Sequence, residues 1–244
     1  MAPATELLVD LESIQEFMRE ALEQISDTEM HAIEHEARDK SARFRSVLGT
    51  PGAALSLDRD GLRRVLRSVF PVRRRADTLL NSVGPAELAA RIDDLLHGPA
   101  ALDIRWPHFV EGLENGLDLA SELLHFTFPE RWWLWTGWMW DPTIDTGALR
   151  LVTMDSAELR GANGVESYYK VGRAIAFVQE TGAAAGLPQF LNHGPFGIDV
   201  FLACVYGIYL YTVVRIRMTR EFNRFVPELP QLARRLLGIH GLEV

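Results

Sequence analysis

The stretch Val200-Phe-Leu-Ala-Cys-Val-Tyr-Gly-Ile-Tyr-Leu-Tyr-Thr-Val-Val214 runs for 15 residues without a formal charge. A helix that crosses a membrane needs about 20 apolar residues, whereas this run is closed by Asp199 on one side and by Arg215 and Arg217 on the other. Its length therefore predicts a buried core helix rather than a membrane span. We expect this helix to extend from about residue 197 to about residue 225.

Two helices are predicted at the start of the chain. Apolar residues recur there at a spacing of three and four, which is typical of one helix face and predicts a helix over residues 5–25. The stretch Ser26-Asp-Thr-Glu29 fits a capping box that opens a second helix, and Gly49-Thr-Pro-Gly52 ends it. We expect an antiparallel helical hairpin over residues 1–50, packed on a main helical domain over residues 51–244.

The rest of the chain is also expected to be helical. The same spacing and the Gly/Pro breaks predict helices over 57–69, 85–97, 108–127 and 165–185, and a short one after Pro230. Only residues 149–154 fit a strand, and nothing alternates as βαβ units would. The sequence therefore predicts an all-α fold, a single helical domain of about ten helices with at most one short strand pair.

Composition limits the classes of function. The net charge of −8 argues against a general attraction to nucleic acid or to an anionic membrane. Cys204 is the only cysteine, so no disulfide or thiolate metal cluster can form within the chain, and its apolar neighbours predict a small hydrophobe rather than a nucleophile. The first residues lack the pattern of a secretory signal, so we expect a cytoplasmic protein.

Five of the six tryptophans lie within nine residues, in the stretch Glu130-Arg-Trp-Trp-Leu-Trp-Thr-Gly-Trp-Met-Trp-Asp-Pro142. No single helix or strand can direct all five indoles to one core. The rings could fill a core, line a ligand pocket or form a protein interface. The candidate ligand-binding residues are Trp133, Trp135, Trp138, Trp140, Asp141, His125 and His193.

Two details refine this hypothesis. Indoles stack on sugars, bases or fused rings, and Asp141 could fix a polar or cationic group. If the segment forms a pocket or interface, at least one of Trp133, Trp138 and Trp140 should be replaceable by alanine at a cost below about 1 kcal/mol and still be needed for binding. We expect this residue to be Trp138, because Gly137 suggests that the backbone turns there.

An alternative hypothesis is an enzyme with an acid–base or metal site near Glu122, His125 and His193. Glu122-Leu-Leu-His125 has the Glu-x-x-His spacing of di-iron helical bundles, but those sites need a second such pair and two more carboxylates. No second pair occurs, so we expect no bound metal. The acidic side chains of residues 111–125 are then expected to form a solvated helix face.

A second alternative is a nucleic-acid-binding protein. Seven arginines lie between Arg59 and Arg75 against one aspartate, and Arg73, Arg74 and Arg75 are the candidate anion-binding residues. An ordinary solvated helix face would look similar.

No dinucleotide, P-loop or serine-hydrolase motif occurs, so no cofactor class is indicated. The sequence thus favours a helical binding or accessory protein that takes a small molecule or a protein partner at a tryptophan-rich site.

Overall fold

A computed structural model describes residues 9–186, 194–217 and 227–240, and in this part the chain is all-α, as predicted. Its only β pairings there are two isolated bridges, Val9 with Thr153 and Asp141 with Thr146. The helices are α1 (Leu11–Gln24), α2 (Asp27–Leu48), α3 (Arg59–Arg67), α4 (Ala76–Val83), α5 (Pro85–His97), α6 (Leu102–Val110), α7 (Gly116–Thr127), α8 (Gly164–Ala184), α9 (Pro195–Arg217) and α10 (Leu229–Leu236), with the 3₁₀ turns η1 (Ala54–Ser56), η2 (Arg73–Arg75) and η3 (Ala148–Leu151).

Side-chain caps fix several helix starts. Asp10, Asp58 and Asn163 each accept a hydrogen bond from the backbone N–H three residues on, which satisfies one donor that the first helical turn leaves open. The predicted capping box is present in part, because the N–H of Glu29 donates to Ser26 Oγ at 3.1 Å. Short polar residues therefore mark where these helices begin.

The chain divides into two compact units, neither of which is continuous in sequence. Unit 1 comprises residues 1–31 and 137–233, and unit 2 comprises residues 32–136 and 234–244. The predicted hairpin over residues 1–50 crosses the first of these boundaries, and its separation from residues 51–244 stays a prediction.

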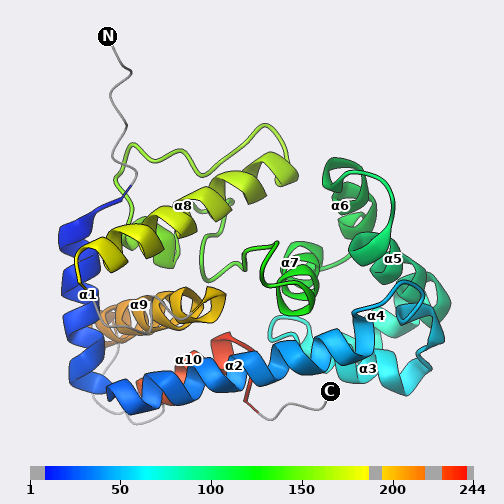
Figure 1. The fold of residues 1–244 in the computed structure, drawn as a ribbon, viewed down its shortest axis with the longest axis horizontal. Helices are drawn as coiled ribbons and strands as arrows, with labels where there is room; N and C mark the ends of the chain where they lie inside the picture. The colour runs from blue at the N-terminus through cyan, green and yellow to red at the C-terminus, as the bar shows by residue number, and fades with distance from the viewer. Residues whose placement is uncertain (1–8, 187–193, 218–226, 241–244) are drawn as a thin grey trace. The chain divides into compact units, whose positions relative to one another are not determined.

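Unit 1 is built around α9, which packs against α1, α8 and η3 (Figure 1). Ile198, Phe201, Cys204 and Ile208 of α9 are all buried, as the uncharged stretch predicted. By length and composition alone α9 could cross a membrane, but two thirds of the relevant segment, 67%, is buried inside the protein. The core helix of a soluble protein has these same properties, so the absence of a membrane span stays a prediction.

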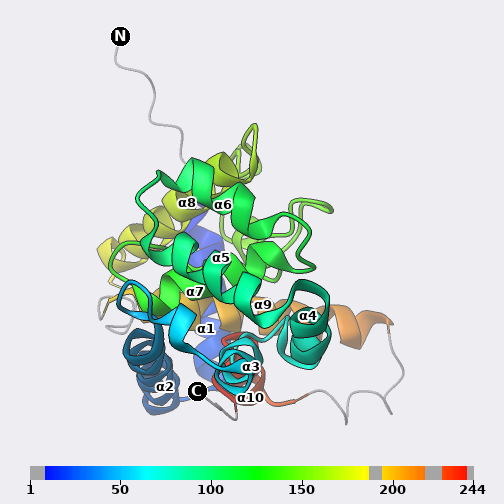
Figure 2. The same cartoon turned by 90° about the vertical axis from the view of Figure 1, so that its right-hand side faces the viewer.

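Unit 2 is organised around α5, which contacts α3, α4, α6, α7 and η1 (Figure 2). Leu88, Ile92 and Leu95 form its buried stripe. Helix α7 differs from the usual amphipathic helix because every side chain from Leu119 to Thr127 is buried. A helix covered on all sides has to bury its polar residues as well, and this property decides the surroundings of Glu122 and His125.

Two local predictions are wrong. The single helix expected over 108–127 is two helices, α6 and α7, separated at residues 111–115. Gly112 and Asn115 adopt positive φ angles of 69° and 56°, which a right-handed helix cannot contain. The strand expected over 149–154 is largely η3, and only Thr153 takes part in a bridge.

Candidate ligand site beside Trp138

The tryptophan segment is the stretch where the chain passes from unit 2 to unit 1. Trp132, Trp133 and Trp135 belong to unit 2, whereas Trp138 and Trp140 belong to unit 1. Residues 132–136 have no helical or strand structure, and residues 137–139 form a turn, as Gly137 suggested. The five indoles are therefore divided between two compact units and do not share one core.

In the first half of the segment, Trp135 is part of the core of unit 2. The Trp135 ring is stacked on Trp106 with centroids 6.4 Å apart and planes 9° apart, and the Trp135 backbone N–H donates to Ser121 Oγ at 2.6 Å. His125 Nδ1 donates to the carbonyl oxygen of Trp132 at 2.8 Å. Trp133 is half-buried. Trp135 and His125 thus have structural roles in unit 2.

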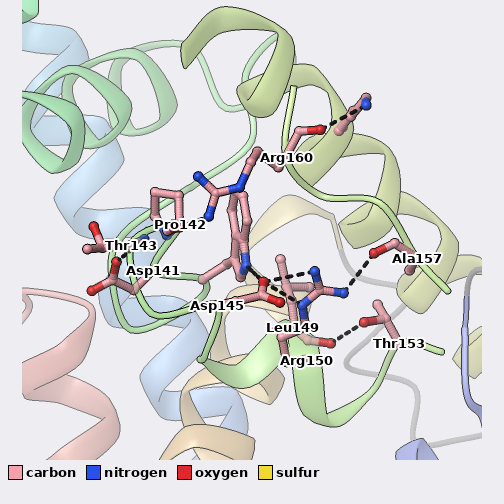
Figure 3. A network of polar contacts seen from close by, with 11 residues as sticks. Asp141, Pro142, Thr143, Asp145, Leu149, Arg150, Thr153, Ala157 and Arg160 are labelled. Carbon is pink, nitrogen blue, oxygen red and sulfur yellow. Dashed lines mark hydrogen bonds and ion pairs between the residues drawn. The ribbon is translucent and has the colours of Figure 1, made fainter. Parts of the chain in front are cut away.

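The second half of the segment contains a network of hydrogen bonds around Trp140 (Figure 3). The Trp140 indole N–H donates to Asp145 Oδ1 at 2.8 Å, and Arg150 Nε donates to the same oxygen at 2.8 Å. Arg150 Nη1 also donates to the Ala157 carbonyl oxygen at 2.7 Å. The indole N–H, with help from Arg150, holds the pKa of Asp145 below its ordinary value. Trp140 is fully buried, so its donor and the Asp145 carboxylate satisfy each other.

The same network shapes the loop of residues 141–147. The backbone N–H of Asp141 donates to the Thr146 carbonyl oxygen at 2.8 Å, and Asp145 adopts a left-handed backbone with φ 54°. Gly147 has φ 133° and lies so close to Met139 that a Cβ would stand 2.5 Å from its carbonyl oxygen. The loop therefore has a defined shape and presents Asp141 in a fixed position.

Beside this loop lies a small aromatic and acidic cluster, which we call the Tyr206 patch; it consists of Trp138, Asp141, Tyr206 and Tyr209. The Tyr206 ring lies 6.1 Å from the Trp138 ring and 6.1 Å from the Tyr209 ring, tilted by 46° and 36°. Burial raises the pKa of Tyr206, and Tyr209 and the nearby negative charge of Asp141 raise it further. Both tyrosines and Asp141 are half-buried, so the patch reaches solvent.

Trp138 is buried, with 7% of its surface exposed, and its expected replaceability at small cost in stability stays a prediction. Its indole Nε1 is fully buried and has no hydrogen-bond acceptor among the described residues. This differs from Trp140, whose indole N–H has Asp145. The predicted residues Trp138 and Asp141 therefore fall into one cluster, and Trp133 and Trp135 belong to the other unit.

Glu122, expected on a solvated face, is buried in unit 2 against a lysine that sequence reasoning overlooked. Lys40 Nζ lies 2.6 Å from Glu122 Oε2 and donates to the Leu237 carbonyl oxygen at 2.9 Å, and the two side chains are 0% and 1% exposed. The Lys40 ammonium also stands 3.9 Å from the centroid of the Phe126 ring. Because α7 is covered on all sides, Ser121, Glu122 and His125 have their partners inside the protein, whereas the buried Thr127 hydroxyl has none among the described residues.

The electrostatics of Glu122 reflect that burial. Burial raises the pKa of Glu122, while the neighbouring Lys40 ammonium acts in the opposite direction. His125 is also fully buried. Among the described residues no group of three or more His, Cys, Asp or Glu side chains could hold a metal ion. Glu122 and His125 are thus joined to unit 2 by internal contacts.

Most of the arginine cluster has partners within the protein. Arg63 contacts Asp60 and Asp77, Arg75 pairs with Glu114, and Arg73 donates to the His240 carbonyl oxygen at 2.6 Å. Arg74 is exposed. Anion binding by Arg73, Arg74 and Arg75 stays a prediction.

His193 lies outside the described residues. Cys204 is buried, and burial raises the pKa of its thiol to about 12, in agreement with the hydrophobic role expected for it. Tyr206 and Tyr209 were missed as site residues because the sequence places them inside the apolar run of α9. A signal was present, since a tyrosine hydroxyl in such a run needs a polar partner or solvent.

No protein-family model, no curated protein and no solved structure matches the chain.

Proposed function

We propose that the chain is a binding protein and that its ligand contacts the Tyr206 patch. The observation that carries this proposal is the indole N–H of Trp138, a buried donor without an acceptor among the described residues. Buried polar groups in folded proteins are nearly always hydrogen-bonded, so an unpaired one calls for an explanation. Several such side-chain atoms occur among the described residues, and we interpret the one at Trp138, beside the half-buried rings of the patch, as a donor for a ligand. The aromatic faces and the Asp141 carboxylate supply the apolar and polar contacts that small-molecule sites combine.

The neighbouring network strengthens the argument by contrast. Trp140 and Asp145, a few residues from Trp138 and Asp141, are also an indole and a carboxylate, and they form a hydrogen bond with each other. Asp141 accepts a hydrogen bond from the Thr143 backbone N–H at 2.7 Å, and no arginine or lysine of the described residues pairs with it. In the part of the chain that the structure describes, the Trp138 indole N–H therefore has no acceptor and the Asp141 carboxylate has no basic partner.

The two alternative functions gain less support. The Lys40–Glu122 pair and His125 are fully buried, and the arginines near Arg63 and Arg75 contact acidic side chains of the same unit. An enzyme built on Glu122 and His125, and nucleic-acid binding through Arg59–Arg75, therefore stay predictions from the sequence.

Proton–nitrogen NMR spectra test the proposal directly, because each of the six tryptophans contributes one indole N–H signal. The signal of Trp138 is identified as the one that Trp138→Phe removes. We expect at least one member of a set of small cationic, neutral aromatic and sugar probes to shift the Trp138 signal in a saturable way. The Trp135 signal is the internal control, because Trp135 belongs to the core of unit 2.

A pair of tyrosine variants locates the site. Tyr206→Leu is expected to abolish the shift, whereas Tyr169→Leu should leave it unchanged, since Tyr169 is an exposed tyrosine of the same unit outside the patch. If no probe of any class moves the Trp138 signal, the patch is packing and the proposed function is wrong.

A further inference from the structure

We infer that the ligand of the Tyr206 patch is a small organic ammonium ion that also carries a hydrogen-bond acceptor. This inference rests on the proposed function and names its ligand class. Three features of the patch support it: the aromatic rings of Trp138, Tyr206 and Tyr209, the negative charge of Asp141, and the unpaired indole N–H of Trp138. Each restricts the chemistry of the ligand in a different way.

The ring faces favour a cation over a hydrophobe. The negatively polarised face of an aromatic ring attracts an ammonium or guanidinium group within about 6 Å of the ring centroid. Tyr206 touches both other rings of the patch, with centroids 6.1 Å from Trp138 and 6.1 Å from Tyr209. Contiguous rings of this kind can surround one side of an alkylated ammonium group, whose methyl groups also gain from apolar contact.

The carboxylate fixes the sign of the charge. Asp145 is neutralised by Arg150, but Asp141 pairs with no basic side chain of the described residues. The Asp141 side chain points away from the Asp145–Arg150 pair in Figure 3. A carboxylate beside aromatic faces attracts a cation and repels an anion, and the net charge of −8 acts in the same direction.

The open donor defines the second group on the ligand. The Trp138 indole N–H can only donate, so its missing partner is an acceptor such as a hydroxyl or carbonyl oxygen. An ammonium group for the rings and Asp141, joined to an oxygen for Trp138, meets all three requirements. An anion could supply only the acceptor for Trp138, and an uncharged hydrocarbon could supply only apolar contact with the rings.

Choline and its neutral analogue dimethylbutanol, in which carbon replaces the ammonium nitrogen, test the charge requirement at constant shape. We expect choline to shift the Trp138 indole signal in a saturable way, and dimethylbutanol to bind at least about tenfold more weakly, in line with the strength of cation–π and charge contacts in partly desolvated sites. Asp141→Asn should weaken choline binding by about the same factor. Asp155→Asn, a matched change at an exposed aspartate of the same unit, should not.

A second comparison tests the acceptor. Tetramethylammonium lacks the oxygen, so it should bind more weakly than choline to the wild type. Trp138→Phe, followed through the signals of Tyr206 and Tyr209, should remove that difference and leave tetramethylammonium binding nearly unchanged. Equal affinities of choline and tetramethylammonium for the wild type would overturn the acceptor requirement.

The failures of the two proposals are distinguishable. Binding of dimethylbutanol or of a sugar as tight as that of choline would overturn the cation inference, while the patch would remain a binding site. Loss of choline binding in Asp155→Asn as well as in Asp141→Asn would show a nonspecific charge effect and would also overturn it. Absence of any shift with any probe overturns both proposals.

Discussion

Two polar clusters, the Lys40–Glu122 pair of unit 2 and the Tyr206 patch of unit 1, differ in how their groups are paired. In unit 2 the Lys40 ammonium and the Glu122 carboxylate lie 2.6 Å apart with almost no exposure. In unit 1 the Asp145 carboxylate has Trp140 and Arg150, but the neighbouring Asp141 and the Trp138 indole N–H lack equivalent partners among the described residues. Polar groups that satisfy one another stabilise a fold, whereas polar groups left open beside aromatic rings suggest a ligand.

The sharpest test of this contrast is the buried lysine. Lys40→Met should lower the free energy of unfolding by about 3–5 kcal/mol, because it leaves the Glu122 carboxylate buried without its partner. Urea denaturation followed by circular dichroism measures the loss. The double variant Lys40→Met/Glu122→Leu should recover most of it, since apolar residues of similar size often replace a buried ion pair without cost. A single-variant loss below about 1 kcal/mol would mean that the pair contributes little to unit 2.

The next test concerns the core half of the tryptophan segment. Trp135→Ala should destabilise the protein by about 3–5 kcal/mol, the usual cost of emptying a large aromatic site. Trp135 is 1% exposed and stacked on Trp106, whereas Trp133 is half-buried, so Trp133→Ala should cost clearly less. Chemical denaturation of the two variants side by side gives the comparison. Equal losses would show that the segment is packed uniformly in unit 2.

A smaller effect is expected at the satisfied carboxylate of unit 1. Asp145→Asn should cost about 1 kcal/mol, because the carboxylate is partly exposed and the amide oxygen can still accept from Trp140. The pKa of Asp145 is held below the ordinary value of 3.8, so its charged form stabilises the fold above that pH. The stabilisation is lost as the pH falls through the lowered pKa. Unfolding free energies of wild type and variant should therefore converge in acid, and a constant difference would contradict this assignment.

The smallest change in stability is expected at Asp141. Asp141→Asn should alter the free energy of unfolding by less than about 0.5 kcal/mol, because the asparagine oxygen can keep the hydrogen bond from the Thr143 backbone N–H. Thermal unfolding of the variant, measured together with its ammonium binding, separates the two roles. A loss as large as that of Asp145→Asn would make Asp141 a structural residue and remove the contrast between the two carboxylates.

Local sequence signals were sufficient for much of the fold. Residues 85–97 were predicted as a helix and form α5 with these same bounds, because Pro85 opens it and Gly98 follows it. The break between α6 and α7 was not predictable from spacing, since the apolar stripe continues through it. There the left-handed backbone at Gly112 and Asn115 overrides the periodic pattern.

The candidate site was predicted only in part. Trp138 and Asp141 were named from the tryptophan segment, but Tyr206 and Tyr209 come from α9, far along the chain. Bringing them together depends on tertiary packing, which the spacing of one helix does not contain. Lys40 was missed for the same reason, although it is one of only two lysines and its partner Glu122 was itself a candidate site residue.

Lys40 joins parts of unit 2 that are far apart in the sequence. Its second hydrogen-bond acceptor, the Leu237 carbonyl oxygen, stands almost at the end of the chain, and Arg234 of the same segment binds Glu36. The Lys40 ammonium and this acceptor are 197 residues apart in the sequence, so their contact closes a long loop. Long-range closure of this kind slows folding, so we expect the contacts of Arg234 and Leu237 with α2 to form after the local helices of unit 2.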